Sequence, residues 1–224
     1  MSTFFEDKSV VVIGASGVLG AELSRNLLAQ GANVHVVVRT PENLNSEFST
    51  LPLAQAEIES REALANALDE LGGSFDGVIN AAGVVAFGSL ADVPNEIVGK
   101  LFAANAQGTV NVLSLAGTHV KEGGFVASLT GVAADLDVLG MSAYCASKAA
   151  AKKAMSIAAR ELRSKKITVL DVRAPHTETG LVNRALFGEA PKMPQGLTPQ
   201  QVSARILQAL ESGEKDLPAD AFSA

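Results

Sequence analysis

The 224-residue sequence is poor in the residues that build disulfides, metal sites and aromatic clusters: it has one cysteine, three histidines, one tyrosine and no tryptophan. A single cysteine excludes an intramolecular disulfide framework and a cysteine zinc site, and it suits a reducing cytoplasm. We expect Cys145 to be a small packing residue. Three scattered histidines predict no metal site.

Long hydrophobic runs and an excess of positive charge are also missing. No uncharged apolar run reaches the roughly 18 residues that indicate a transmembrane helix, and residues 1–8 are too short and too acidic for a signal peptide. With 24 acidic and 18 basic residues, the net charge of −6 argues against a nucleic-acid-binding surface. These absences predict a soluble, cytoplasmic protein without a membrane or nucleic-acid partner.

The sequence does contain short apolar, β-branched runs that alternate with longer helical patterns. This alternation is typical of βαβ units with right-handed crossovers, and it predicts a doubly wound parallel sheet, a Rossmann fold of three α/β/α layers. No linker-like segment interrupts the pattern, so we expect one domain over residues 1–224. The predicted strands are Val10–Ile13, Val34–Val38, Leu51–Ile58, Gly77–Ile79, Gly124–Leu129 and Ile167–Val172, and the predicted helices are Gly17–Gln30, Ser60–Leu71, Ile97–Val120, Ser142–Ser164 and Pro199–Ser212.

Three glycines join the first predicted strand to the first helix, in VVVIGASGVLGAEL. Glycine permits a sharp turn and the close approach of a phosphate, and a helix N-terminus offers free N–H groups. The spacing G-x-x-G-x-x-G differs from the G-x-G-x-x-G dinucleotide fingerprint, although its second half matches. The strand and helix context favours a dinucleotide site over a packing turn. The predicted contact residues are Gly14, Ser16, Gly17, Leu19 and Gly20.

The end of the second predicted strand indicates which dinucleotide binds. An acidic residue near this point would bind the ribose hydroxyls of NAD, but Val38 and Arg39 stand there instead. An arginine can donate a charge-assisted fork to a 2′-phosphate, and Thr40 can add a hydroxyl, which together favour NADP(H) over NAD(H). The alternative is a solvated arginine at a strand end.

The segment SAYCASKAAA places the only tyrosine four residues before a lysine. On a helix, Tyr144 and Lys148 would share one face, with Cβ atoms about 5–6 Å apart. These residues alone leave two interpretations open. One is a helix that packs through its small side chains, and the other is a phenol held beside an ammonium so that it can exchange a proton near neutral pH.

Four motifs occur in an order that resembles the short-chain dehydrogenases/reductases, and the resemblance covers nearly the whole chain. The motifs are the glycine turn, NAAG at residues 80–83, the asparagine in AANAQG, and YCASK. Tyr144 and Lys148 match the family's Y-x-x-x-K pair, and Asn105 matches the asparagine of its proton relay. The residues that match the family's adenosine side are Asn80, Ala81, Ala82 and Gly83, with Glu57 and Ile58 standing approximately where the family has Asp-Val against the adenine.

The resemblance implies an oxidoreductase that transfers a hydride between NADPH and a small carbonyl or alcohol substrate. Tyr144 would donate a proton to the carbonyl oxygen during reduction, or remove one during oxidation. Lys148 would lower the pKa of Tyr144 and hold the nicotinamide ribose, and Asn105 would position a water that links Lys148 to solvent. The family associates through helices that match Ile97–Val120 and Ser142–Ser164, which implies a homodimer or homotetramer.

One family residue is missing. The serine that hydrogen-bonds the substrate oxygen lies 13 residues before the tyrosine, and this position is Gly131 here. Ser128 and Thr130 would face the same side of an extended strand. We expect Thr130 to substitute, because it lies at the strand end where cofactor clefts open. The alternatives are Ser128, a water molecule, or a Thr130 that only satisfies backbone groups in the turn.

The region after the sixth strand is expected to close the site. Pro175 and His176 stand where the family has Pro-Gly, and Thr179 falls near a threonine that contacts the nicotinamide carboxamide or the phosphates, so Pro175 and Thr179 are predicted cofactor contacts. His176 is either a substrate-facing titratable group or a loop residue that acts through its backbone. Residues 180–197 should form a short substrate lid. Its candidate apolar lining, which helix packing explains equally well, is Leu181, Val182, Leu186, Phe187 and Met193.

Two other functions stay open at this point. One is a catalytically weak NADP(H)-binding redox sensor or partner-binding module, which the loss of the serine at Gly131 favours. The other is sugar-nucleotide chemistry on the same fold, which the glycine spacing favours slightly, although the chain is short for the usual substrate domain. The sequence names neither a substrate nor a reaction direction.

Overall fold

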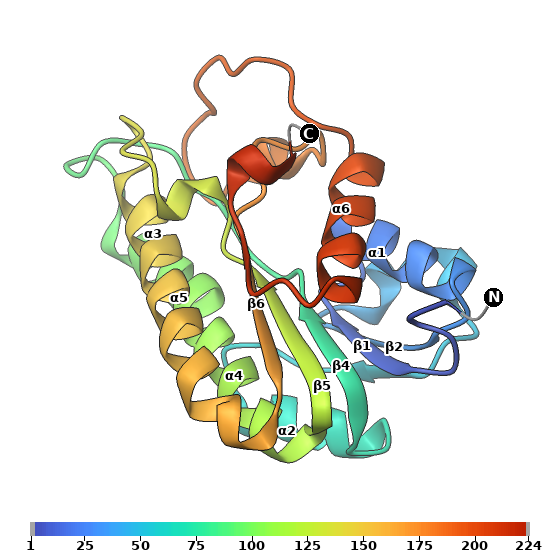
Figure 1. Ribbon diagram of the computed structural model, residues 1–224. Helices are drawn as coiled ribbons and strands as arrows, with labels where there is room; N and C mark the ends of the chain where they lie inside the picture. Colours follow the sequence, from blue (N-terminus) through green and yellow to red (C-terminus); the bar gives the residue numbers. More distant parts are fainter. Residues whose placement is uncertain (1–2, 223–224) are drawn as a thin grey trace.

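In the computed structural model, which describes residues 3–222, seven strands form one parallel sheet in the order β3-β2-β1-β4-β5-β6-β7 (Figure 1). The order reverses between β1 and β4, which is where doubly wound sheets open a ligand-binding crevice. The predicted α/β class and Rossmann topology are confirmed. The strands are β1 (Ser9–Ile13), β2 (Asn33–Val38), β3 (Leu53–Gln55), β4 (Phe75–Asn80), β5 (Val120–Leu129), β6 (Thr168–Val172) and β7 (Asp216–Leu217).

Helices cover both faces of the sheet, because the central strands are apolar on both sides. Alternate residues of β1 belong to two separate cores: Val10 and Val12 face α1 and α6, whereas Val11 and Ile13 face α2, α4 and α5. Figure 1 shows the two layers on opposite sides of the strands. The helices are α1 (Val18–Ala29), α2 (Arg61–Glu70), α3 (Asn95–Leu101), α4 (Gly108–His119), α5 (Ser142–Glu161) and α6 (Pro199–Glu211).

The structure corrects one predicted helix and shortens one predicted strand. The segment predicted as a continuous helix over Ile97–Val120 is α3 and α4 joined by a π-helical turn at Phe102–Gln107. Such turns accommodate an extra residue within a helix and are frequent at functional sites. The strand predicted over Leu51–Ile58 covers only Leu53–Gln55, because β3 is an edge strand that pairs with β2 alone.

Candidate active site

A cleft of about 1550 Å³ opens at the carboxyl ends of the parallel strands. Its walls come from the turns after β1, β2, β4, β5 and β6, and from the segment between β6 and α6. Pockets for a single drug-sized ligand are typically 300–1,000 Å³. The cleft therefore has room for a dinucleotide and a second small molecule.

The glycine turn forms the floor of the cleft under the N-terminus of α1. Gly14 has a φ of +83°, and a Cβ atom on it would lie 2.7 Å from the backbone nitrogen of Ala82. A Cβ on Gly20 would lie 2.3 Å from the carbonyl oxygen of Gly14. The cap residue Gly17 offers no side chain to the first N–H groups of α1. Because Ser16, Gly17 and Leu19 line the cleft, this cradle fits a pyrophosphate.

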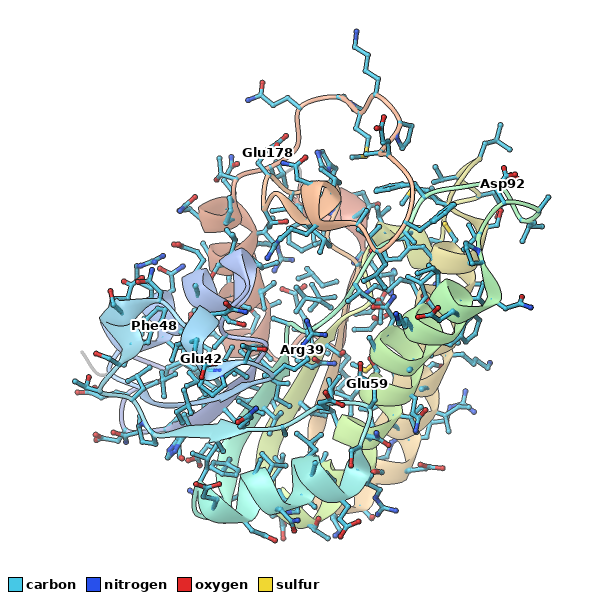
Figure 2. The ribbon with its side chains drawn as sticks, turned by 180° about the vertical axis from the view of Figure 1, so that it is seen from behind. Arg39, Glu42, Phe48, Glu59, Asp92 and Glu178 are labelled. Carbon is cyan, nitrogen blue, oxygen red and sulfur yellow. The ribbon has the colours of Figure 1, made fainter. Side chains whose placement is uncertain are left out.

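The turn after β2 supplies a cation to the wall of the cleft. Arg39 is exposed, lines the cleft together with Thr40 and Asn43, and is within ion-pair distance of no acidic side chain among residues 3–222. Figure 2 labels Arg39 near the middle of the view, with Glu59 below it and Glu178 on the segment above, and both Arg39 and Glu59 line the cleft. The guanidinium is therefore able to donate hydrogen bonds to an anionic ligand.

Two predicted adenosine-side residues do not reach the cleft. Ile58 lines it, but Glu57 is exposed outside it, and sequence reasoning missed that Glu59 lies in the wall. Asn80 is buried: its Nδ2 donates to Oγ of Ser128 (3.0 Å), and its Oδ1 accepts from the backbone of Ala82 (3.1 Å). Asn80 therefore shapes the turn, and the neighbouring residues Ala81, Ala82 and Gly83 line the cleft.

The π-helical turn places Asn105 behind that wall. Its Nδ2 donates to the carbonyl of Val84 and to Oγ of Ser147 (both 3.0 Å), while its Oδ1 accepts from the backbone nitrogen of Val84 (3.0 Å). A Cβ on Gly83 would lie 3.1 Å from Oδ1 of Asn105 and 3.3 Å from Nζ of Lys148. Glycine at this position therefore lets the loop, Asn105 and Lys148 approach one another closely.

Tyr144 and Lys148 both line the cleft from the first turns of α5. Nζ of Lys148 lies 6.0 Å from the centre of the Tyr144 ring and donates to the carbonyl of Leu129 (2.9 Å). Burial lowers the pKa of Lys148 to about 8, with the Asp171 carboxylate acting in the opposite direction. Burial raises the pKa of Tyr144 to about 12, so the expected lowering by Lys148 is wrong for the protein alone. The phenol stays protonated near neutral pH.

The structure also overturns the substitution expected for the missing serine. Thr130 is fully buried, does not line the cleft, and donates its hydroxyl to the Asp171 carboxylate. Ser128 is buried as well and bonds to Asn80. Both hydroxyls are therefore engaged away from the cleft, whereas Gly131, which has a φ of +76°, lines it. A Cβ on Gly131 would meet no atom within 4 Å, so this position faces open space.

The segment after β6 covers the other end of the cleft. Pro175, His176 and Thr179 line it, and Nε2 of His176 lies 3.4 Å from a carboxylate oxygen of Glu178. Within the expected lid, Leu181, Val182 and Met193 line the cleft, but Leu186 and Phe187 do not. Instead, the backbone of residues 186 and 187 bonds to that of Val85 and Phe87, which joins the lid to the loop after β4.

A family comparison identifies this architecture. The sequence model of the family described as short chain dehydrogenase matches residues 8–187. The chain belongs to the short-chain dehydrogenase/reductase family. This family member is 31% identical over 169 residues to the short chain dehydrogenase/reductase AacuN of Aspergillus aculeatus, which covers 74% of this chain and 63% of that protein's length. It is 26% identical over 169 residues to the cyclic-di-GMP-binding biofilm dispersal mediator protein of Escherichia coli, covering 74% of this chain and 71% of that protein.

A similar solved structure contains a nicotinamide cofactor. A short chain dehydrogenase from Burkholderia cenocepacia J2315, crystallised in complex with NADP, matches with a TM-score of 0.83 and 25% identity, covering 98% of this chain and 99% of that one. The protein is thus an NAD(P)-dependent oxidoreductase. Within residues 3–222, no helix is long and apolar enough to span a membrane, and no cluster of histidine, cysteine and carboxylate side chains could hold a metal.

Proposed function

We propose that the protein transfers a hydride between NADPH and a small carbonyl or alcohol substrate. The observation that carries this proposal is the pairing of Tyr144 and Lys148 on one wall of a cleft whose floor is a glycine cradle for phosphates. The bound nicotinamide supplies the hydride chemistry, and the protein supplies orientation and proton transfer.

Tyr144 is the proton donor for carbonyl reduction in this proposal. Its raised pKa keeps the phenolic proton on Oη near neutral pH, ready for transfer to a developing alkoxide. Lys148 holds the nicotinamide ribose, since its ammonium lies at the cleft wall with one hydrogen bond to the Leu129 carbonyl and two N–H groups left to donate. Asn105 holds the loop in place through its two hydrogen bonds to the backbone of Val84. In this proposal it also positions a water that links Lys148 to solvent.

Arg39 selects NADPH over NADH. Its exposed guanidinium lines the adenosine side without an acidic partner among the described residues, and Thr40 and Asn43 lie beside it. An arginine fork matches the geometry of a 2′-phosphate, whereas NADH presents only a hydroxyl there.

Calorimetry with both cofactors, followed by a panel of carbonyl compounds monitored by NADPH absorbance, tests this function. We expect tighter binding of NADPH and consumption of it with at least one carbonyl. Equal affinities for the two cofactors would contradict the role of Arg39. Tight NADPH binding without turnover across the panel would move the conclusion to the second candidate.

The second candidate is a catalytically weak NADP(H)-binding sensor or partner-binding module. The supporting observation is Gly131, where the hydroxyl that binds the substrate oxygen is missing and no neighbouring hydroxyl replaces it. The relative from Escherichia coli is named as a cyclic-di-GMP-binding protein that mediates biofilm dispersal. This name supports a binding function as an alternative to catalysis. Measuring NADPH-dependent binding partners becomes informative only if the carbonyl panel fails.

We also propose a cytoplasmic homodimer or homotetramer, formed through the faces of α4 and α5. Val110 and Ile157 are 47% and 46% exposed on these helices, and Phe102 in the adjoining π-helical turn is 38% exposed. Apolar side chains on the surfaces of adjacent helices are suited to a two-fold interface. Light scattering at micromolar concentration should give a multimer, and a monomer would contradict the proposal.

A further inference from the structure

Arg173, directly after β6, holds a buried guanidinium among three carboxylates. Its side chain is only 7% exposed. Nη1 donates to Oδ2 of Asp171 and to Oδ1 of Asp216, each at 2.6 Å, and Nη2 donates to Oδ2 of Asp216 at 2.9 Å. Nε lies 2.7 Å from Oδ2 of Asp135, which is an ion-pair distance, although the N–H is not aligned with this oxygen as a hydrogen bond requires. A fork of fixed geometry therefore joins three acidic residues from different parts of the chain.

These carboxylates belong to elements with different relations to the cleft. Asp171 lies on β6 and accepts the hydroxyl of Thr130, and Asp216 begins β7 at the edge of the sheet. Asp135 lies in the segment 131–141 between β5 and α5, which we call the active-site loop. Eight of the eleven residues of the active-site loop line the cleft, and it leads directly into the turn that carries Tyr144.

Asp135 is held from two sides. Besides the Arg173 guanidinium, it pairs with Lys152, which lies one helical turn after Lys148 on α5. No other ion pair among residues 3–222 involves the active-site loop. Backbone bonds from Gly131 to Val172 and from Val132 to Ala174 anchor the start of the loop to the end of β6, and the contact between Asp135 and Arg173 is its one ion pair to this part of the fold among the described residues.

We propose that Arg173 is a positioning residue for the substrate side of the cleft, acting through Asp135 to fix the active-site loop against β6. The proposal rests on the proposed oxidoreductase function for its kinetic consequence only. Removing the Asp135 carboxylate leaves the Arg173 guanidinium paired with Asp171 and Asp216, so the cluster persists while the loop loses its ion pair to it. The loop would then shift relative to Tyr144, while the glycine cradle on the far side of the cleft would not.

Two matched variants separate positioning from stability. Asp135→Asn and Asp216→Asn each remove one carboxylate from the same guanidinium, but only Asp135 belongs to the active-site loop. We expect Asp135→Asn to raise the KM for a carbonyl substrate about 10-fold, with NADPH affinity unchanged within about two-fold, since a shift on the order of 1 Å in a substrate-positioning group can cost about 10²-fold. Asp216→Asn should leave the KM within about two-fold of the unaltered protein.

A readout that does not depend on turnover comes from Tyr144, which is the only tyrosine in the sequence. Labelling with tyrosine that carries ¹³C only at Cζ gives one side-chain resonance, and it comes from the site itself. Asp135→Asn should shift or broaden this resonance, and Asp216→Asn should leave it in place. The NMR experiment remains decisive if no substrate is found, so failure of the proposed function and failure of this inference are distinguishable.

Arg173→Lys gives the conservative test, because it keeps the charge and loses the fork. We expect it to reproduce the Tyr144 shift of Asp135→Asn, since one ammonium cannot reach all three carboxylates with the same geometry. Equal shifts from Asp135→Asn and Asp216→Asn would show a general loss of stability and overturn the inference. An unchanged Tyr144 resonance and an unchanged KM in Asp135→Asn would overturn it as well.

Discussion

The two halves of the cleft differ in how closely they follow the family. On the side predicted to hold the adenosine and pyrophosphate, the glycine cradle and the NAAG turn have geometry that leaves no room for larger residues. On the substrate side, a glycine stands at the position of the family's serine, and Leu139 is 94% exposed on the active-site loop. We attribute this difference to the ligands. The cofactor half must fit a cofactor of constant shape, whereas the substrate half must fit a substrate that differs between relatives.

Tyr144→Phe should have the largest effect, because Tyr144 stands where the two halves meet. Removing the hydroxyl removes the proton donor, and general acid catalysis contributes about 10²–10⁴-fold to a rate. The ring remains, so the affinity for NADPH should be nearly unchanged. Single-turnover kinetics and calorimetry measure the two quantities, and a large loss of NADPH affinity would place Tyr144 in the cofactor half only.

The titration of Lys148 should make the free energy of unfolding depend on pH. Its pKa in the folded protein, about 8, is below the 10.5 of the free side chain, so the unfolded chain binds more protons between these values. The free energy of unfolding should therefore rise as the pH increases from about 8 to 10.5, by at most about 3 kcal/mol. Urea unfolding of Lys148→Met should lack this rise, and an identical pH profile in both proteins would show that the ammonium is already solvated.

Arg39→Asp tests the cofactor half at its far end. Hydrogen bonds to charged groups contribute about 1.5–3 kcal/mol, so the affinity for NADPH should fall roughly 10- to 100-fold. The new carboxylate can accept the ribose hydroxyls of NADH, which should then bind more tightly than NADPH. Arg39→Gln is the control that removes the charge without adding an acid, and it should abolish the preference without reversing it.

Gly131→Ser tests whether the substrate half lacks only a hydroxyl. The space beyond Gly131 is open, but its φ of 76° and ψ of 158° lie in a region almost confined to glycine, which costs a side chain about 1–3 kcal/mol. We expect turnover to rise about 10-fold, less than the 10²–10³-fold that removal of such a donor costs, because the turn does not hold serine in the family geometry. Gly131→Ala carries the same strain without the hydroxyl, and an equal gain in both variants would rule out hydrogen bonding as the cause.

The sequence predicted the fold and the cofactor half because their signals are local. Glycines between a strand and a helix, and a tyrosine four residues before a lysine, fix geometry over a few residues. The cleft accordingly contains Gly17, Arg39, Tyr144 and Lys148 as predicted. Their roles in binding and catalysis stay predictions until the variants are measured.

The errors arose where a side chain's direction depends on distant contacts. Extending the alternation of the strand one residue past Leu129 could not show that Asp171, 41 residues later, accepts the Thr130 hydroxyl. The pKa of Tyr144 was misjudged because burial, which a sequence does not show, is the largest effect on the phenol and raises its pKa. The π-helical turn was missed because a window over Ile97–Val120 shows helical periodicity throughout, and the extra residue leaves only a small phase change.

That π-helical turn has a consequence for how α3 and α4 can vary in length. Each residue added to an α-helix rotates everything after it by about 100° and advances it by about 1.5 Å. A wide turn at Phe102–Gln107 absorbs one residue locally, so the helix before it and the helix after it keep their own faces toward the sheet. The same turn carries Asn105, whose side chain bonds to Val84 and Ser147. Deleting Ala106 would therefore straighten the helix and rotate Asn105 and the packed face of α4 out of phase with each other.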